Sequence, residues 1–233
     1  MKQPKDSDIA ALTAKLEQIA PHVSKSDDPE WSHPPAVQII DCVLSLNRPY
    51  DRFVVPRLKV FMDRHPEIHR VTQLSDLMAG YSTPHEFVVN ELCYDHEDRA
   101  RILQSVVSFV CSVVEQSPTT PEEDTLKQWA MRAKPQDFQK LNIRGFALAG
   151  FQYLRMLFGT ETTKPDMHIR GFISEVLGRN VSDLAALILL EAASQRASLS
   201  VRDVDRYIWR SRARGDESKS SNRAENNRHH LTK

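Results

Sequence analysis

Residues 141–172 read LNIRGFALAGFQYLRMLFGTETTKPDMHIRGF, and the interpretation of the whole chain starts from them. This stretch predicts a short hairpin that bends at Gly145, then an amphipathic helix over residues 146–158, and then a loop that ends in Pro165 and Asp166. A carboxylate at the start of a helix, close to a hairpin whose backbone amides face outward, suits chemistry beside a phosphate backbone.

The composition indicates a globular protein built mainly from helices. The 233 residues are 40% hydrophobic and 27% charged, which is enough apolar material for one large core or two small ones. The chain holds only seven glycines, which favours helices over a turn-rich β fold. No run approaches the roughly 18 apolar residues of a membrane span, and the charged N-terminal segment lacks the apolar core of a signal peptide. We therefore expect a cytoplasmic protein with no membrane partner.

Three widely spaced cysteines, Cys42, Cys93 and Cys111, fit free thiols in a reducing compartment. Their spacing matches neither a zinc finger nor an iron–sulfur motif. His65 and His69 stand four residues apart, but Pro66 between them breaks the helical register. We therefore expect no metal site and no iron–sulfur cluster.

The formal net charge is zero, so the overall field does not indicate a nucleic-acid binder. The charge is unevenly distributed, however. Residues 196–233 contain ten Lys or Arg against five Asp or Glu, a local excess of 10 − 5 = +5. This segment is either a solvated tail or a phosphate-seeking one. Residues 215–233 show no apolar periodicity, and we expect them to form a disordered basic tail.

The apolar periodicity along the chain predicts roughly ten to twelve helices and an all-α fold. We divide the chain into an N-terminal helix and linker (residues 1–35), a helical domain (36–214) and the tail. Within the domain, residues 135–158 form the hairpin and residues 159–166 the loop that carries Asp166. We expect a monomer.

Two local motifs suggest chemistry, and each also has a structural explanation. The hairpin is surrounded by the positive charges of Lys134, Lys140 and Arg144, and it can bind DNA phosphate through backbone amides. Helix-turn-helix pairs are also common as plain core elements. Asp166 follows Pro165, and an isolated Pro-Asp pair is often no more than a helix cap.

The order and spacing of these motifs resemble the helix-hairpin-helix (HhH-GPD) DNA glycosylase superfamily. That family has an approximate L-P-G-V-G hairpin, a helix that ends in a small apolar residue and Gly, six further residues, and then an Asp followed two positions later by His. Here the hairpin is residues 141–145, the helix ends at Phe158-Gly159, residues 160–165 follow, and Asp166 and His168 complete the pattern. The resemblance extends over residues 36–212, but its specific part covers about thirty residues.

The resemblance implies a two-lobed helical fold with the active-site cleft between the lobes. It makes Asp166 the carboxylate that supports cleavage of an N-glycosidic bond after base flipping. The implied partner is double-stranded DNA that carries a damaged or modified base, which in turn implies a nucleoid-associated protein. The implied DNA contacts come from the following residues: Lys140, Asn142, Arg144, Gly145 and His168.

The upstream residues 36–62 are similar to the first long helix of the family, its wedge loop and the helix that follows. Residues 45–50 would form the loop, with Asn47 as the wedge. The alternative is an ordinary helix-stop sequence. Tyr50 and Phe146 are candidates for stacking on a flipped base, although aromatic residues at helical spacing usually belong to the core.

The chain departs from the family pattern at the hairpin. Ile143 replaces the first glycine and Asn142 replaces the proline, so a monovalent or divalent cation at the hairpin stays an open question. Lyase members carry a lysine two or three positions after the second hairpin glycine, where this chain has Ala147 and Leu148. The resemblance therefore implies a monofunctional hydrolytic enzyme without a cofactor. The alternatives are a non-catalytic HhH DNA-binding protein and a helical protein-interaction domain.

Overall fold

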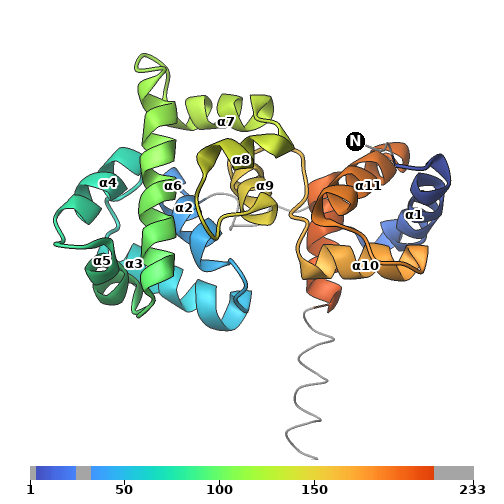
Figure 1. Cartoon of the computed structure of the whole chain (residues 1–233), viewed down its shortest axis with the longest axis horizontal. Helices are drawn as coiled ribbons and strands as arrows, with labels where there is room; N and C mark the ends of the chain where they lie inside the picture. The colour runs from blue at the N-terminus through green and yellow to red at the C-terminus, as the bar shows by residue number, and fades with distance from the viewer. Residues whose placement is uncertain (1–3, 25–32, 213–233) are drawn as a thin grey trace, which may run out of the picture. The chain divides into compact units, whose positions relative to one another are not determined.

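The computed structural model describes residues 4–24 and 33–212 (Figure 1). All regular secondary structure in these ranges is helical, which confirms the predicted all-α class. The chain divides into two compact units: Met1–Ser26 with Glu161–Lys233 form unit 1, and Asp27–Thr160 form unit 2. The predicted disordered tail, residues 215–233, lies outside the described residues.

Unit 2 is built around α2, Pro35–Leu44, whose ten residues are all buried. Its continuous apolar sequence and the proline at its first turn predict this buried helix. The helices that contact it include α3 (Val55–Arg64), α4 (Val71–Ala79), α6 (Glu97–Glu115) and α9 (Leu148–Leu157).

The remaining elements of unit 2 are η3 (Tyr50–Val54), α5 (Pro84–Leu92), α7 (Glu122–Arg132), η4 (Pro135–Asp137) and α8 (Phe138–Leu141). Thr83 caps α5 by accepting a hydrogen bond from the amide of Glu86 at 3.1 Å. Residues 50–64 form a π-helical turn followed by α3 rather than one continuous α-helix. Pro56 has no amide to donate to the preceding turn, so the α-helical pattern begins only at Val55.

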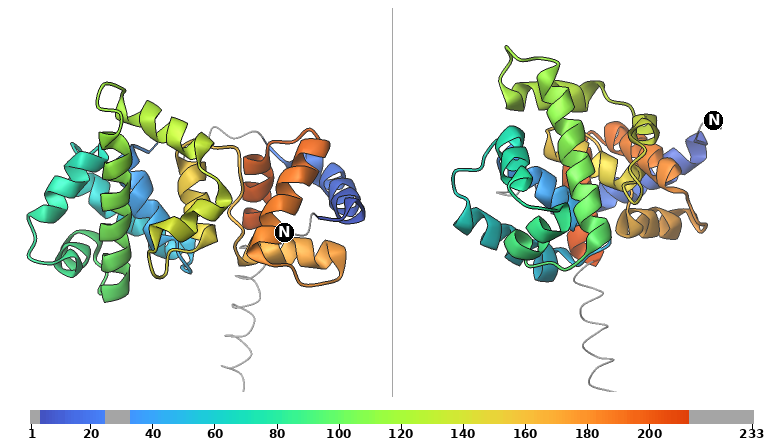
Figure 2. Two further views of the ribbon diagram at one scale, coloured as in Figure 1. Left: turned by 45° about the horizontal axis from the view of Figure 1, so that its top comes forward. Right: turned by 60° about the vertical axis from the view of Figure 1, so that its left-hand side comes forward.

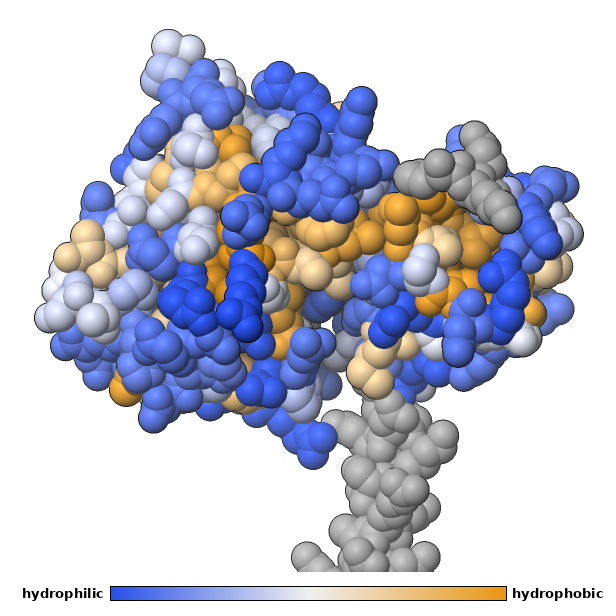
Figure 3. Space-filling view, in the orientation of Figure 1, coloured by the Kyte–Doolittle hydropathy of each residue, from blue (hydrophilic) through white to orange (hydrophobic). Residues whose placement is uncertain are grey.

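Apolar side chains of unit 2 reach the surface beside α6 and α7, where most of the surrounding residues are hydrophilic (Figure 3). Phe109 of α6 and Trp129 of α7 are partly buried against the core, and their ring centroids lie 5.4 Å apart with an edge-to-face geometry. Trp129 also contacts the rings of Phe151 and Phe158. The aromatic contacts thus join α6, α7 and α9.

Unit 1 combines the first described helix with the last three. It contains α1 (Asp6–Ile19), η1 (Ala20–His22), α10 (Met167–Leu177), α11 (Asp183–Arg196) and a final helix over residues 201–212. The apolar face of α1 packs against α10 and α11 (Figure 2). The compact units therefore differ from the predicted ranges 1–35 and 36–214, because the apolar partners of α1 lie after residue 160.

The helix ends of unit 1 coincide with residue types that commonly end or cap helices. Gly178 adopts a left-handed conformation at the end of α10. Ser182 accepts a hydrogen bond from the amide of Ala185 at the start of α11, and Ser200 accepts one from the amide of Asp203. In unit 2, by contrast, Pro121 stands at the cap position of α7, and no side chain caps that helix.

No single helix in residues 4–24 and 33–212 is long and apolar enough to cross a membrane. Two successive helices, Asp183–Arg196 and Val201–Arg212, are long and apolar enough only when they are taken together, and the chain bends by 116° at the break between them. Both helices contribute buried side chains to the core of unit 1.

Candidate functional site

The predicted hairpin is a turn in unit 2 that joins α8 to α9. Its backbone has two left-handed residues, Asn142 (φ 49°) and Gly145 (φ 89°). Asparagine tolerates this conformation better than most residues, so α8 ends at Leu141 without a glycine. The amide of Phe146 closes the turn by donating a hydrogen bond to the carbonyl of Ile143 at 3.0 Å.

Ile143 stands where the resembled family has its first hairpin glycine. Its φ is not positive, and its side chain packs partly buried against the core of unit 2. Gly145 differs, because a Cβ there would lie 2.8 Å from Cδ1 of Ile102 and the backbone is left-handed. The bend therefore requires glycine at position 145 and accepts isoleucine at 143 without backbone strain.

The predicted DNA-binding residues Lys140, Asn142 and Arg144 are all exposed on the hairpin. Lys140 forms an ion pair with Asp137, with Nζ 2.7 Å from Oδ1. This contact, together with the amide of Lys134, lowers the pKa of the Asp137 carboxyl. Arg144 has no acidic partner among the described residues. Its charge, unlike that of Lys140, is uncompensated within the hairpin.

Helix α9 begins without a side-chain cap at Ala147. Phe151 donates a hydrogen bond from its amide to the carbonyl of Ala147 at 3.0 Å, so the amides of residues 148–150 precede the first helical bond. The helix ends at Leu157, and Gly159 follows with a φ of 94°. This end agrees with the break that the sequence predicts at Phe158-Gly159.

The chain after α9 enters unit 1 as a loop that is bonded residue by residue to the last two helices. Oε1 of Glu161 accepts hydrogen bonds from the hydroxyl of Ser200 (2.7 Å) and the amide of Arg202 (3.2 Å). The hydroxyl of Thr162 donates to Oε1 of Glu191 in α11 at 2.6 Å. The loop is thus fixed to two different helices before it reaches Asp166.

Asp205, from the helix 201–212, holds the next two residues of the loop. Its Oδ2 accepts hydrogen bonds from the hydroxyl of Thr163 and from the amide of Lys164, the latter at 2.9 Å. Asp205 is only 9% exposed. Four successive residues, 161–164, are therefore bonded to the C-terminal helices of unit 1.

Asp166 caps α10 with only one of its carboxylate oxygens. Oδ1 accepts hydrogen bonds from the amides of His168 (2.8 Å) and Ile169 (3.2 Å). Oδ2 accepts none from the described residues, and the side chain is half-buried. His168 is also half-buried. Its ring packs edge to face against that of Trp209, with the ring centroids 6.5 Å apart.

Burial, and to a smaller extent the negative charge of Asp166, together raise the pKa of Asp205 to about 7. The hydrogen bonds from Thr163 and Lys164 oppose the rise. The sequence interpretation did not include Asp205, although its position in the sequence is unusual. It occupies the same helical face as the apolar residues Val201, Val204 and Ile208, where a carboxyl is costly to bury.

The predicted wedge residue, Asn47, is exposed in the turn after α2 and is left-handed, with a φ of 54°. The hydroxyl of Tyr50 donates a hydrogen bond to Oδ2 of the fully buried Asp41 at 2.8 Å. Tyr153 of α9 also donates to this carboxylate, at 3.2 Å from Oδ1. Phe146 is only 3% exposed and belongs to the core of unit 2. The wedge and base-pocket roles stay predictions.

The predicted site residues therefore fall into two groups. Residues 140–146 and the turn with Asn47 and Tyr50 belong to unit 2, whereas Asp166 and His168 belong to unit 1. Within unit 1, the structure adds Asp205 to the surroundings of Asp166.

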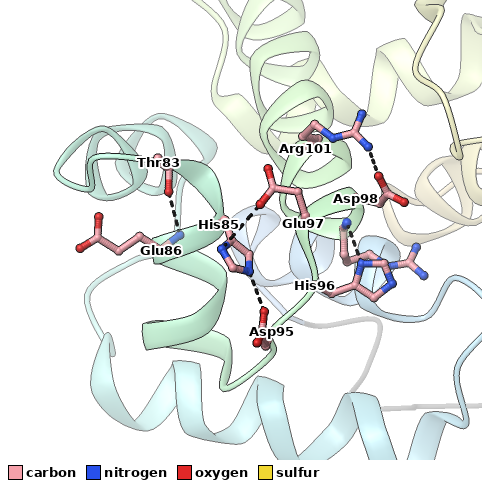
Figure 4. Close-up of polar contacts among 9 residues, drawn as sticks. Thr83, His85, Glu86, Asp95, His96, Glu97, Asp98 and Arg101 are labelled. Carbon is pink, nitrogen blue, oxygen red and sulfur yellow. Dashed lines mark hydrogen bonds and ion pairs between the residues drawn. The ribbon is translucent and has the colours of Figure 1, made fainter.

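A second polar cluster lies at the surface of unit 2, between α5 and the start of α6 (Figure 4). His85 Nε2 is 2.8 Å from Oδ1 of Asp95, and its Nδ1 is 3.6 Å from Oε2 of Glu97. Nearby, the ring of His96 accepts a hydrogen bond from the amide of Arg99 at the start of α6. Within residues 4–24 and 33–212, no group of three or more His, Cys, Asp or Glu side chains is arranged to hold a metal ion.

The chain belongs to the family described as Domain of unknown function (DUF8548), which matches residues 10–213. The match includes both the hairpin and the Asp166 loop. No curated protein and no solved structure matches the chain significantly.

The raised pKa of Asp205 predicts a pH-dependent contribution to stability. The folded protein binds this proton more tightly than the unfolded chain does, so the contribution is full below pH 4 and is lost as the pH rises through about 7. Replacing Asp205 by Asn should remove a pH dependence on the order of 3–5 kcal/mol between these limits. Urea unfolding of both proteins from pH 4 to pH 8 measures it.

Glu91 and Asp137, whose pKa values are lowered, act in the opposite direction in both proteins. The difference between wild type and Asp205→Asn therefore isolates the one carboxyl. Parallel stability curves over this pH range would contradict the burial of an ionisable Asp205.

Proposed function

We propose that this protein is a DNA glycosylase that hydrolyses the N-glycosidic bond of a damaged or modified base and leaves an abasic site. The observation that carries the proposal is the hydrogen bonding of the Asp166 carboxylate. One of its oxygens is used in capping α10, and the other accepts no hydrogen bond from the described residues. A half-buried carboxylate with one uncommitted oxygen can face a developing positive charge.

The proposed chemistry follows from the charge that builds up when the base leaves. The deoxyribose becomes oxocarbenium-like, and a nearby carboxylate stabilises it and orients the attacking water. Electrostatic stabilisation of this kind is worth about 10²–10³ in rate for a well-placed group. Two amides and a tightly bonded loop hold Asp166, so little reorganisation would be needed during the reaction.

The hairpin supports the DNA-binding part of the proposal. Its tip exposes Asn142, Arg144 and Gly145, and the uncapped first amides of α9 follow at once. A phosphate group can accept hydrogen bonds from such amides while Arg144 contributes charge. Ile143 does not hinder this approach through backbone strain, because its φ is not positive.

The main alternative is a non-catalytic DNA-binding protein. The observation that favours it is the cap itself, because two hydrogen bonds to main-chain amides give Asp166 a structural purpose without any reaction. A protein-interaction domain without a nucleic-acid role is the third possibility. Absence of salt-dependent DNA binding at low ionic strength would favour the protein-interaction domain.

Asp166→Asn should abolish the release of bases while DNA binding and stability are retained. Asparagine caps helices about as well as aspartate, so only the charge is lost. The assay incubates the protein with duplexes that carry an alkylated, an oxidised, a mismatched or a hypermodified base, and alkali reveals abasic sites. Asp183→Asn makes the same change in the first turn of α11 and should keep full activity. Full activity of Asp166→Asn on a duplex that wild type cuts would refute the role of Asp166.

Arg144→Ala should weaken DNA binding and lower the dependence of log Kd on log salt by about one phosphate contact. Arg144 is exposed and has no acidic partner among the described residues, so the fold should be unaffected. Fluorescence anisotropy over a salt series gives both quantities. Lys59→Ala, which removes an exposed charge from α3, is the control. Equal effects of the two substitutions would show that Arg144 acts only through net charge.

Borohydride should not trap the protein covalently on abasic DNA. The lysine that forms a Schiff base in lyase members is replaced by the exposed Ala147 and the buried Leu148, so no amine is offered there. Gel electrophoresis after reduction detects a covalent complex, with a lysine-dependent lyase as the positive control. Efficient trapping would refute a purely hydrolytic reaction.

A further inference from the structure

The loop that carries Asp166 is held by a buried carboxyl from another helix. Oδ2 of Asp205 accepts hydrogen bonds from the hydroxyl of Thr163 and the amide of Lys164. These two residues stand directly before Pro165 and Asp166. A single acceptor therefore fixes two consecutive residues just ahead of the carboxylate.

The contacts continue from Asp205 to Asp166 without a gap. The carbonyl of Lys164 accepts a hydrogen bond from the amide of Asp166 at 2.7 Å. Pro165 between them is buried, and its ring restricts φ. The orientation of the Asp166 backbone therefore depends on where Asp205 holds Lys164.

The placement of Asp205 has no explanation in core packing. Its neighbours on the same helical face are Val201, Val204 and Ile208, and an apolar side chain would continue that face at no desolvation cost. Burial, and then the charge of the neighbouring Asp166, raise the pKa of Asp205. Among the contacts given above, this costly buried carboxyl accepts hydrogen bonds only from Thr163 and Lys164 of the loop.

We propose that Asp205 is a positioning residue that fixes the loop 161–166 and thereby directs the uncommitted oxygen of Asp166. The catalytic consequence rests on the proposed glycosylase function, whereas the anchoring of the loop does not. Asp205 itself contacts the loop and need not touch the substrate.

Matched substitutions at Thr163 test the anchor from the loop side. Thr163→Val removes the hydroxyl and keeps the shape, whereas Thr163→Ser keeps the hydroxyl. Thr13→Val is the control, because Thr13 is also a buried threonine of unit 1, and its hydroxyl donates to the carbonyl of Ile9 within α1. On the helix side, Asp205→Ala removes the acceptor and Asp205→Asn keeps a carbonyl oxygen in its place.

The first readout is the rate of base release on whichever duplex of the modified-base panel wild type cuts. Thr163→Val and Asp205→Ala should lower the rate at saturating DNA by about 10- to 100-fold, as a small misplacement of a catalytic group does. The Kd for the duplex should stay within about twofold in both variants, because the loss affects the reacting geometry alone. Thr163→Ser, Asp205→Asn and Thr13→Val should stay near the wild-type rate. Combining Thr163→Val with Asp205→Ala should add no further loss.

The second readout is amide hydrogen exchange of the peptide that spans residues 160–169, measured without DNA. Exchange should be about tenfold faster in Thr163→Val and Asp205→Ala than in wild type or Thr13→Val, because local opening of the loop becomes easier. Unchanged exchange, or an unchanged rate of base release in Thr163→Val, would overturn the positioning role. If wild type releases no base from any duplex, the proposed function fails, and exchange alone still decides whether Asp205 anchors the loop.

Discussion

The complete burial of α2 is the constraint on which unit 2 depends. Because no face of α2 meets solvent, the helices around it must approach closely, and α9 does so through Gly150. A Cβ at Gly150 would lie 2.8 Å from a side-chain carbon of Leu46, and Cys42 donates a hydrogen bond from its thiol to the carbonyl of Gly150 at 3.3 Å. Asp41, inside the same buried helix, receives hydrogen bonds from Tyr50 and from α9. Packing against α2 therefore fixes both the turn with Asn47 and the helix that follows the hairpin.

The sequence predicted those features that short-range chemistry decides. Gly145, Gly178 and Ser182 act where their conformational preference or their hydroxyl group predicts a bend, a helix end or a cap, because each effect is complete within a few residues. The apolar run of α2 likewise predicts its burial. The resembled family has glycine at the position of Ile143. Isoleucine is compatible with the turn because the left-handed residue is Asn142.

Long-range contacts could not be predicted in the same way. Tyr153 reaches Asp41 across 112 residues of chain, and Thr163 reaches Asp205 across 42. Neither pairing has a local signature, since it depends on which helices share a core. The same holds for α1, whose apolar face is visible in the sequence while its partners α10 and α11 are not. The sequence thus predicted Asp166 as a candidate and left its surroundings undefined.

The way α10 begins differs from the way the two following helices begin. Ser182 caps α11 and Ser200 caps the last helix with a single hydroxyl, and a cap of that kind is enough to start a helix. At α10, the loop before the cap is bonded at four successive residues, and one of the acceptors is a buried carboxyl. Capping accounts for Oδ1 of Asp166 and for nothing else in this arrangement. A rigid loop and an uncommitted oxygen are what a carboxylate needs if it must hold a fixed position toward a reacting group.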